Sequence, residues 1–204
     1  MIRSFAVGVL AVTLVVAVVG CSRSPQVTFY TLDAGMRLDR ASAKAVPIVV
    51  VGPVTLPELV DRPQLVLRVA SNRVDILEAH RWGESLRSEI SRLIAENLGG
   101  LLGSSGVSSY LQQSVAEAEY RVMVDIKRFE AVPGEAVTID AVWSLRRASG
   151  GDRITGHSLL REPFATPAGA EAYDPVVAAY GRALLSLSGD IAKAISAEAA
   201  PNQL

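Results

Sequence analysis

The residues that could perform chemistry in this chain of 204 are few and scattered. They include one cysteine and two histidines, His80 and His157, and the acidic residues show no clustered spacing. Neither histidine has an acidic or histidine companion one helical turn away, so a metal site is not expected. The segment Gly103–Gly106 lacks the spacing of a nucleophile elbow, and there is no phosphate-binding glycine loop. The sequence therefore favours a binding or assembly role over catalysis, without cofactor or metal.

Cys21, the single cysteine, is the clearest reactive position. Residues 5–20 carry no charge, Arg3 precedes them, and Val18-Val19-Gly20 leads directly into the cysteine. A basic start, an apolar stretch shorter than the about 20 residues of a spanning helix, and a small residue before the cut are typical of a cleaved signal peptide. Residues 18–21 resemble the lipobox of bacterial lipoproteins. We therefore expect S-diacylglycerol on the thiol and N-palmitate on the new amine.

Three acyl chains would hold the mature protein on a membrane, because two already give a stable anchor. The residue after Cys21 is Ser22, not the aspartate that retains lipoproteins in the inner membrane of enteric-type bacteria. We therefore expect a periplasm-facing position at the outer membrane and disfavour inner-membrane retention. The chain divides into a signal peptide (1–20), a lipidated tether (21–28), one folded domain (29–200) and a tail (201–204).

The charge balance argues against a nucleic-acid partner. Lys and Arg number 20 and Asp and Glu number 21, which gives a formal net charge of −1. No basic cluster with interleaved aromatic residues appears, although such a patch is the usual electrostatic footprint of nucleic-acid binding.

Apolar periodicity predicts alternating strand clusters and helices. Strands are predicted at residues 29–32, 48–54, 65–78 (a hairpin or bent strand), 120–127, 137–145 and 154–161. Apolar stripes predict one helix over residues 84–102 and another from Asp174-Pro175 to Pro201. The resulting βββ-α-βββ-α order predicts an α/β (α+β) two-layer sandwich. Its sheet would be mainly antiparallel, with both long helices on one face.

Three segments carry a family resemblance: Phe29-Tyr30-Thr31-Leu32, the stretch VVVGPVTLPELVDRPQLV over residues 49–66, and Arg81-Trp82-Gly83-Glu84-Ser85-Leu86. Together they resemble the PqiC-like ABC-type transport auxiliary lipoprotein family. The family's usual Tyr-Leu is Leu59-Val60 here, and its usual Ala and Pro near the helix start are Gly83 and Ser85.

This resemblance implies an accessory subunit of an MCE/ABC-type intermembrane lipid transport system. Such a subunit would dock a periplasmic MCE-domain conduit at the outer membrane, reach an ABC transporter through it, and support envelope integrity. It also implies a homo-oligomeric ring. Two alternatives stay open: an outer-membrane assembly or cell-wall-binding lipoprotein without a transport role, and a periplasmic hydrolase whose groups converge only in space.

The motif residues supply candidates for partner binding. Prolines should make the exposed connection through residues 53–63 rigid and unable to pair as a strand. Planar hydrogen-bonding groups and a large aromatic beside a cation are suited to recognition, and these candidates are Arg62, Pro63, Gln64, Arg81 and Trp82. Each also has a structural interpretation: Trp82 can anchor the first helix in the core, and Arg62 can pair with Asp61 or Glu58.

Overall fold

The computed structural model describes residues 26–33, 47–110, 118–165 and 173–199. Cys21, the predicted signal peptide and the predicted tail lie outside them. The described elements, in chain order, are β1 (Thr28–Tyr30), β2 (Val49–Thr55), β3 (Gln64–Ala70), β4 (Arg73–Trp82), α2 (Leu86–Leu102), β5 (Val107–Ser109), β6 (Tyr120–Val132), β7 (Ala136–Arg147), β8 (Ile154–Pro163) and α3 (Asp174–Ala199).

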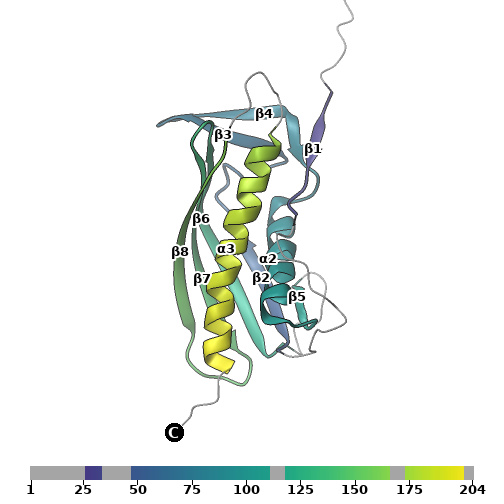
Figure 1. The fold of residues 1–204 in the computed structure, drawn as a ribbon, viewed down its shortest axis with the longest axis vertical. Helices are drawn as coiled ribbons and strands as arrows, with labels where there is room; N and C mark the ends of the chain where they lie inside the picture. Colours follow the sequence, from purple (N-terminus) through teal and green to yellow (C-terminus); the bar gives the residue numbers. More distant parts are fainter. Residues whose placement is uncertain (1–25, 34–46, 111–117, 166–172, 200–204) are drawn as a thin grey trace, which may run out of the picture.

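The larger sheet has five strands in the order β5-β2-β6-β7-β8. Strands β6, β7 and β8 form the predicted antiparallel meander, whereas β2 runs parallel to both β5 and β6. Both helices cover the same face of this sheet (Figure 1). The α+β fold with helices packed on sheets is therefore confirmed.

Buried and less buried side chains alternate along the meander, and the buried ones pack the sheet against the helices. Tyr120, Val122, Val124 and Ile126 of β6 are buried at every second position, as expected for a sheet with one covered face. The opposing stripe of α3 is fully buried at Leu184, Leu187, Ile191 and Ile195. These side chains belong to one continuous apolar core shared with α2.

A second sheet of three strands, in the order β1-β4-β3, caps one end of the molecule (Figure 1). Strands β3 and β4 form an antiparallel hairpin, and β1 adds to β4 in parallel. Leu65, Leu67 and Trp82 are buried on its inner face and belong to the common core. The N-terminal strand is thus built into the cap.

Three details of the structure differ from, or add to, the sequence-based prediction. Residues 65–78 were expected as a hairpin or a bent strand; they form a hairpin whose second strand continues to Trp82. Pro53 lies inside β2, not in a non-pairing connection, because the strand register shifts between Val51 and Val54 and pairing with β6 then resumes. Such an irregularity accommodates a proline that cannot donate to the ladder. Strand β5 is only three residues long and was not predicted.

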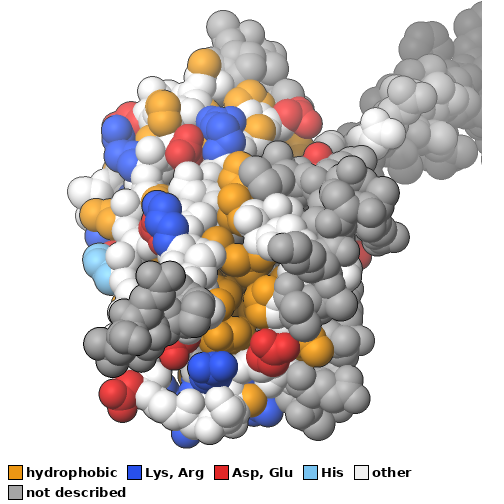
Figure 2. All heavy atoms as spheres, turned by 60° about the horizontal axis from the view of Figure 1, so that its bottom comes forward, with side chains coloured by type: hydrophobic (Ala, Val, Ile, Leu, Met, Phe, Trp, Pro, Cys, Tyr) orange, Lys and Arg blue, Asp and Glu red, His pale blue; other side chains and the backbone are white. Residues whose placement is uncertain are grey.

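Charged side chains of both signs lie on the face of the molecule that Figure 2 shows. Figure 2 brings the end opposite the cap forward and shows a strip of apolar side chains, with Lys, Arg, Asp and Glu around it. No basic patch forms on this face, in keeping with the near-neutral sequence. Within the described ranges, neither helix is long and apolar enough to cross a membrane.

Candidate functional site

The predicted partner-binding residues gather around the capping sheet, beginning with a turn between β2 and β3. The amides of Val60 and Asp61 donate to the carbonyl of Pro57, at 3.0 and 3.2 Å. Val60 is buried and fixes the turn to the core, whereas Leu59 points outward and is 39% exposed. Pro63 is exposed at the end of the turn.

Electrostatic contacts tie this turn to α2. The Asp61 carboxylate pairs with the Arg87 guanidinium of the helix. Arg62 is half-buried, and its Nε has no hydrogen-bond partner. The expected alternative, a pair between Arg62 and Asp61, is therefore replaced by the Asp61–Arg87 pair. A buried guanidinium nitrogen without an acceptor is costly.

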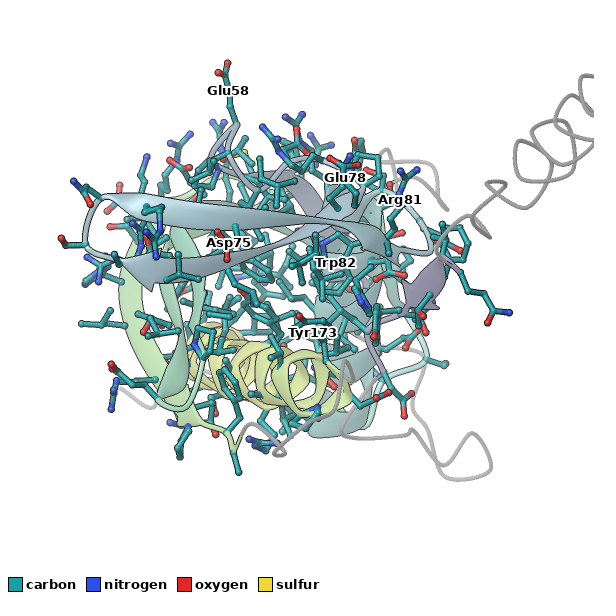
Figure 3. The ribbon with its side chains drawn as sticks, turned by 90° about the horizontal axis from the view of Figure 1, so that it is seen from above. Glu58, Asp75, Glu78, Arg81, Trp82 and Tyr173 are labelled. Carbon is teal, nitrogen blue, oxygen red and sulfur yellow. The ribbon has the colours of Figure 1, made fainter. Side chains whose placement is uncertain are left out.

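Gln64 and Arg81 lie opposite each other on β3 and β4 and meet at a third side chain, Glu78. Gln64 Nε2 donates to Glu78 Oε2 at 3.1 Å, and a terminal nitrogen of Arg81 lies 3.5 Å from the same oxygen. Arg81 Nε also donates to the Glu78 carbonyl at 2.9 Å. Figure 3 shows Glu78 and Arg81 close together on the cap. We call Gln64, Glu78 and Arg81 the cap cluster.

Trp82, although predicted together with Arg81, points the other way. Its side chain is 5% exposed, and its ring meets Tyr180 of α3 edge-to-face at 6.1 Å between centroids. Tyr180 in turn stacks on Phe129. The Trp82 amide donates to the Pro63 carbonyl at 2.7 Å. Trp82 therefore anchors the cap to the core and holds Pro63 and Arg81 in place from below.

The N-terminal strand is locked to the cap through a tyrosine. The Tyr30 hydroxyl lies 3.0 Å from Nδ1 of His80 on β4. It also accepts a hydrogen bond of 3.4 Å from the Tyr173 amide. The His80 ring also meets the Tyr173 ring edge-on. Burial raises the pKa of the Tyr30 phenol, so the hydroxyl stays protonated and can donate to His80. This contact joins β1, β4 and the start of α3.

A second lock holds the backbone of Leu32, just after β1. Its amide donates to Oε2 of Glu89, and its carbonyl accepts from Arg92, both at 3.1 Å. Glu89 is fully buried on α2, and its other oxygen, Oε1, has no partner. Burial raises the pKa of the Glu89 carboxyl. Glu89 and Arg92 thus hydrogen-bond the backbone of Leu32 much as a neighbouring strand would.

Local sequence patterns predict neither the role of Glu78 nor these two locks. The strand register shifts between Gln64 and Leu65, so three extra residues of β4 are inserted there. Alternation alone therefore cannot place Glu78 on the same side as Arg81. The Leu32 lock joins a backbone to a helix 57 positions away.

The groups that the cap brings together are suited to recognition. In the described part of the chain, no group of three metal-binding side chains comes together. The cap cluster offers amide, carboxylate and guanidinium groups held by one another on a rigid sheet. Such an arrangement suits the docking of another molecule.

A helix-covered sheet with a second sheet as cap defines a small α+β domain, with the cap cluster on the surface of that cap. The comparison with protein families then gives its identity. The chain belongs to the family described as "ABC-type transport auxiliary lipoprotein component", whose model matches residues 30–192. This family membership gives the chain a transport-associated accessory role.

Solved structures show the same fold. A crystal structure of an uncharacterized protein has a TM-score of 0.62 at 19% identity, with 83% of this chain and 99% of that chain covered. Protein XCC0632 from Xanthomonas campestris, of the DUF330 family model, has a TM-score of 0.60 at 15% identity, with coverage of 80% and 92%. None of the curated proteins matches the chain.

Proposed function

We propose that this protein is a lipid-anchored accessory subunit of an MCE/ABC-type intermembrane lipid transport system. It docks the periplasmic MCE conduit at the outer membrane and so supports envelope integrity. The observation that carries the proposal is the family match over residues 30–192. Cys21 with its preceding apolar stretch supports the anchor, and Ser22 after it supports outer-membrane sorting.

The cap cluster and the neighbouring turn are the proposed partner-binding surface. Arg81 is 38% exposed and Glu78 is 71% exposed, so both reach solvent while remaining paired. Arg62 and Pro63 lie next to them in the turn, and Trp82 supports them from the core. Because these groups are held before a partner arrives, little side-chain entropy is lost on docking.

A homo-oligomeric ring is part of the same proposal. Strand β8 is an outer strand of the larger sheet and is ten residues long. Such an edge offers backbone groups to a further strand. Neighbouring copies would surround the end of the conduit, each with its cap turned to the partner.

Co-purification with an MCE-domain protein of the same bacterium tests the role. Wild-type mature protein should retain the MCE protein, and Arg81→Glu should release it, because a second carboxylate would then face Glu78. Lys193→Glu on α3 is the matched control, since Lys193 also forms an exposed ion pair three positions away along the chain, with Asp190. Absence of binding by the wild type, or equal loss in both variants, contradicts docking through the cap. Retention on isolated cell walls instead would favour a cell-wall-binding lipoprotein.

A further inference from the structure

Two adjacent aromatic residues of β1 face opposite ways. Tyr30 is 6% exposed and locked to His80, whereas Phe29 is 65% exposed. The parallel register pairs Phe29 with Arg81, which places both on the outer side of the capping sheet. Val27, two positions earlier in the chain, is 41% exposed. A large aromatic side chain in water is unexplained by the fold itself.

The position of β1 in the sheet leaves this region open. Strand β1 is the outer strand in the order β1-β4-β3, and the partner-binding turn leads into β3 at the opposite edge. On the open side of β1, a groove of about 480 Å³ separates the strand from α3, with Val177 and Leu185 in its lining. The exposed apolar residues of β1 therefore adjoin further apolar surface.

The chain before β1 limits what can cover this edge. Seven peptide steps join Cys21 to Thr28, and fully extended they span at most about 25 Å. If Cys21 is acylated, the membrane surface always lies within that distance of β1. Phenylalanine is a residue type that inserts well at the membrane interface.

We propose that the β1 edge of the cap, formed by Val27 and Phe29, rests on the lipid surface. This inference rests on the proposed lipid anchor and adds an orientation to it. The β1 edge faces lipid, the turn before β3 faces the partner, and β4 lies between them. The locks at Tyr30 and Leu32 then make the orientation rigid, because they transmit the position of the anchored strand to the whole domain.

Depth-dependent fluorescence quenching tests the orientation on the acylated mature protein. Phe29→Cys is labelled with the fluorophore NBD; acylated Cys21 has no free thiol and does not react. Val142→Cys is the matched control, because Val142 is 39% exposed but lies on β7, an inner strand of the other sheet. Both proteins are placed on vesicles of phosphatidylethanolamine and phosphatidylglycerol, with or without spin-labelled lipid. Thermal unfolding verifies that each labelled variant is folded.

We expect NBD at position 29 to show blue-shifted emission and loss of emission with spin-labelled lipid, and NBD at position 142 to show neither. Vesicle flotation with no quenching at position 29 overturns the orientation and leaves the anchor standing. A blue shift without quenching also overturns it, because protein then covers the site. Equal quenching at both positions overturns the assignment to β1. Failure to float overturns the anchor and, with it, this inference.

Discussion

The two sheets of this molecule are held in different ways. The five-stranded sheet is sealed by two helices through residues such as Ile139, Leu184 and Leu187, which are fully buried. The three-stranded cap also has a buried inner face, but its N-terminal strand is three residues long and depends on polar locks at Tyr30 and Leu32. Stability therefore resides mainly in the larger sheet, whereas the proposed partner-binding groups and β1 lie on the smaller one.

This difference predicts two levels of opening. Apolar burial distributed over a large sheet resists unfolding as a unit, whereas a short strand held by a few hydrogen bonds can open locally at lower free energy. The cap can therefore carry exposed and polar groups without weakening the body of the domain. The predictions below test this separation, beginning with the largest effect.

Removing core volume from the larger layer should have the largest effect. Leu187→Ala on α3 deletes a side chain with 0% exposure, and such changes lower the free energy of unfolding by about 2–5 kcal/mol. Ile76→Ala on the cap is the matched control, because Ile76 is 37% exposed; its cost should be below about 1 kcal/mol. Urea unfolding measures both. Equal losses would refute the distinction between the two layers.

Gly156 in β8 tests how closely the side chains of the larger sheet are packed. A Cβ at Gly156 would lie 2.1 Å from the Trp143 ring, which is held through its indole N–H by Ser158. Gly156→Ala should therefore lower the free energy of unfolding by about 1–3 kcal/mol. Gly189→Ala on α3 is the control, because a Cβ there meets nothing within 4 Å. It should raise stability by about 0.5–1 kcal/mol, as alanine favours a helix interior. Melting temperatures that move in the same direction would contradict this.

The larger layer could be predicted from the sequence because its signals are local. Alternation from Tyr120 to Ile126 and the apolar stripe of α3 each lie within one element. The cap could be predicted only in part, because its geometry depends on a register shift and on contacts between distant segments. The pairing of Gln64 and Arg81 through Glu78 arises from that shift. Trp82 and Arg81 are sequence neighbours, yet only the folded sheet shows which of them faces the core.

The Tyr30 lock provides the next test, now of the cap alone. Tyr30→Phe keeps the buried ring but removes the hydroxyl that contacts His80 and the Tyr173 amide. A hydrogen bond of this kind contributes about 0.5–1.5 kcal/mol. Hydrogen exchange should accelerate in β1 and the facing part of β4 and remain unchanged in β6 and β7. Tyr110→Phe is the control, because Tyr110 is 41% exposed and lies outside the cap. Uniform acceleration over both sheets would show that the cap does not open separately.

The Glu89 lock should have the smallest effect at neutral pH, and its signature is pH dependence. Burial raises the pKa of Glu89, although the Leu32 amide and Arg92 partly oppose this. The folded state therefore binds the proton more tightly than the unfolded state, so acidification from pH 7 through this pKa adds stability until the unfolded state also protonates. Glu89→Gln keeps an acceptor for Leu32 and cannot titrate. Relative to this variant, the wild type should gain stability as pH falls, as measured by urea unfolding at several pH values. Glu96→Gln, at an exposed position of the same helix, is the control. If the difference in the free energy of unfolding between the wild type and Glu89→Gln stays constant with pH, the buried carboxyl does not hold its proton more tightly in the folded state.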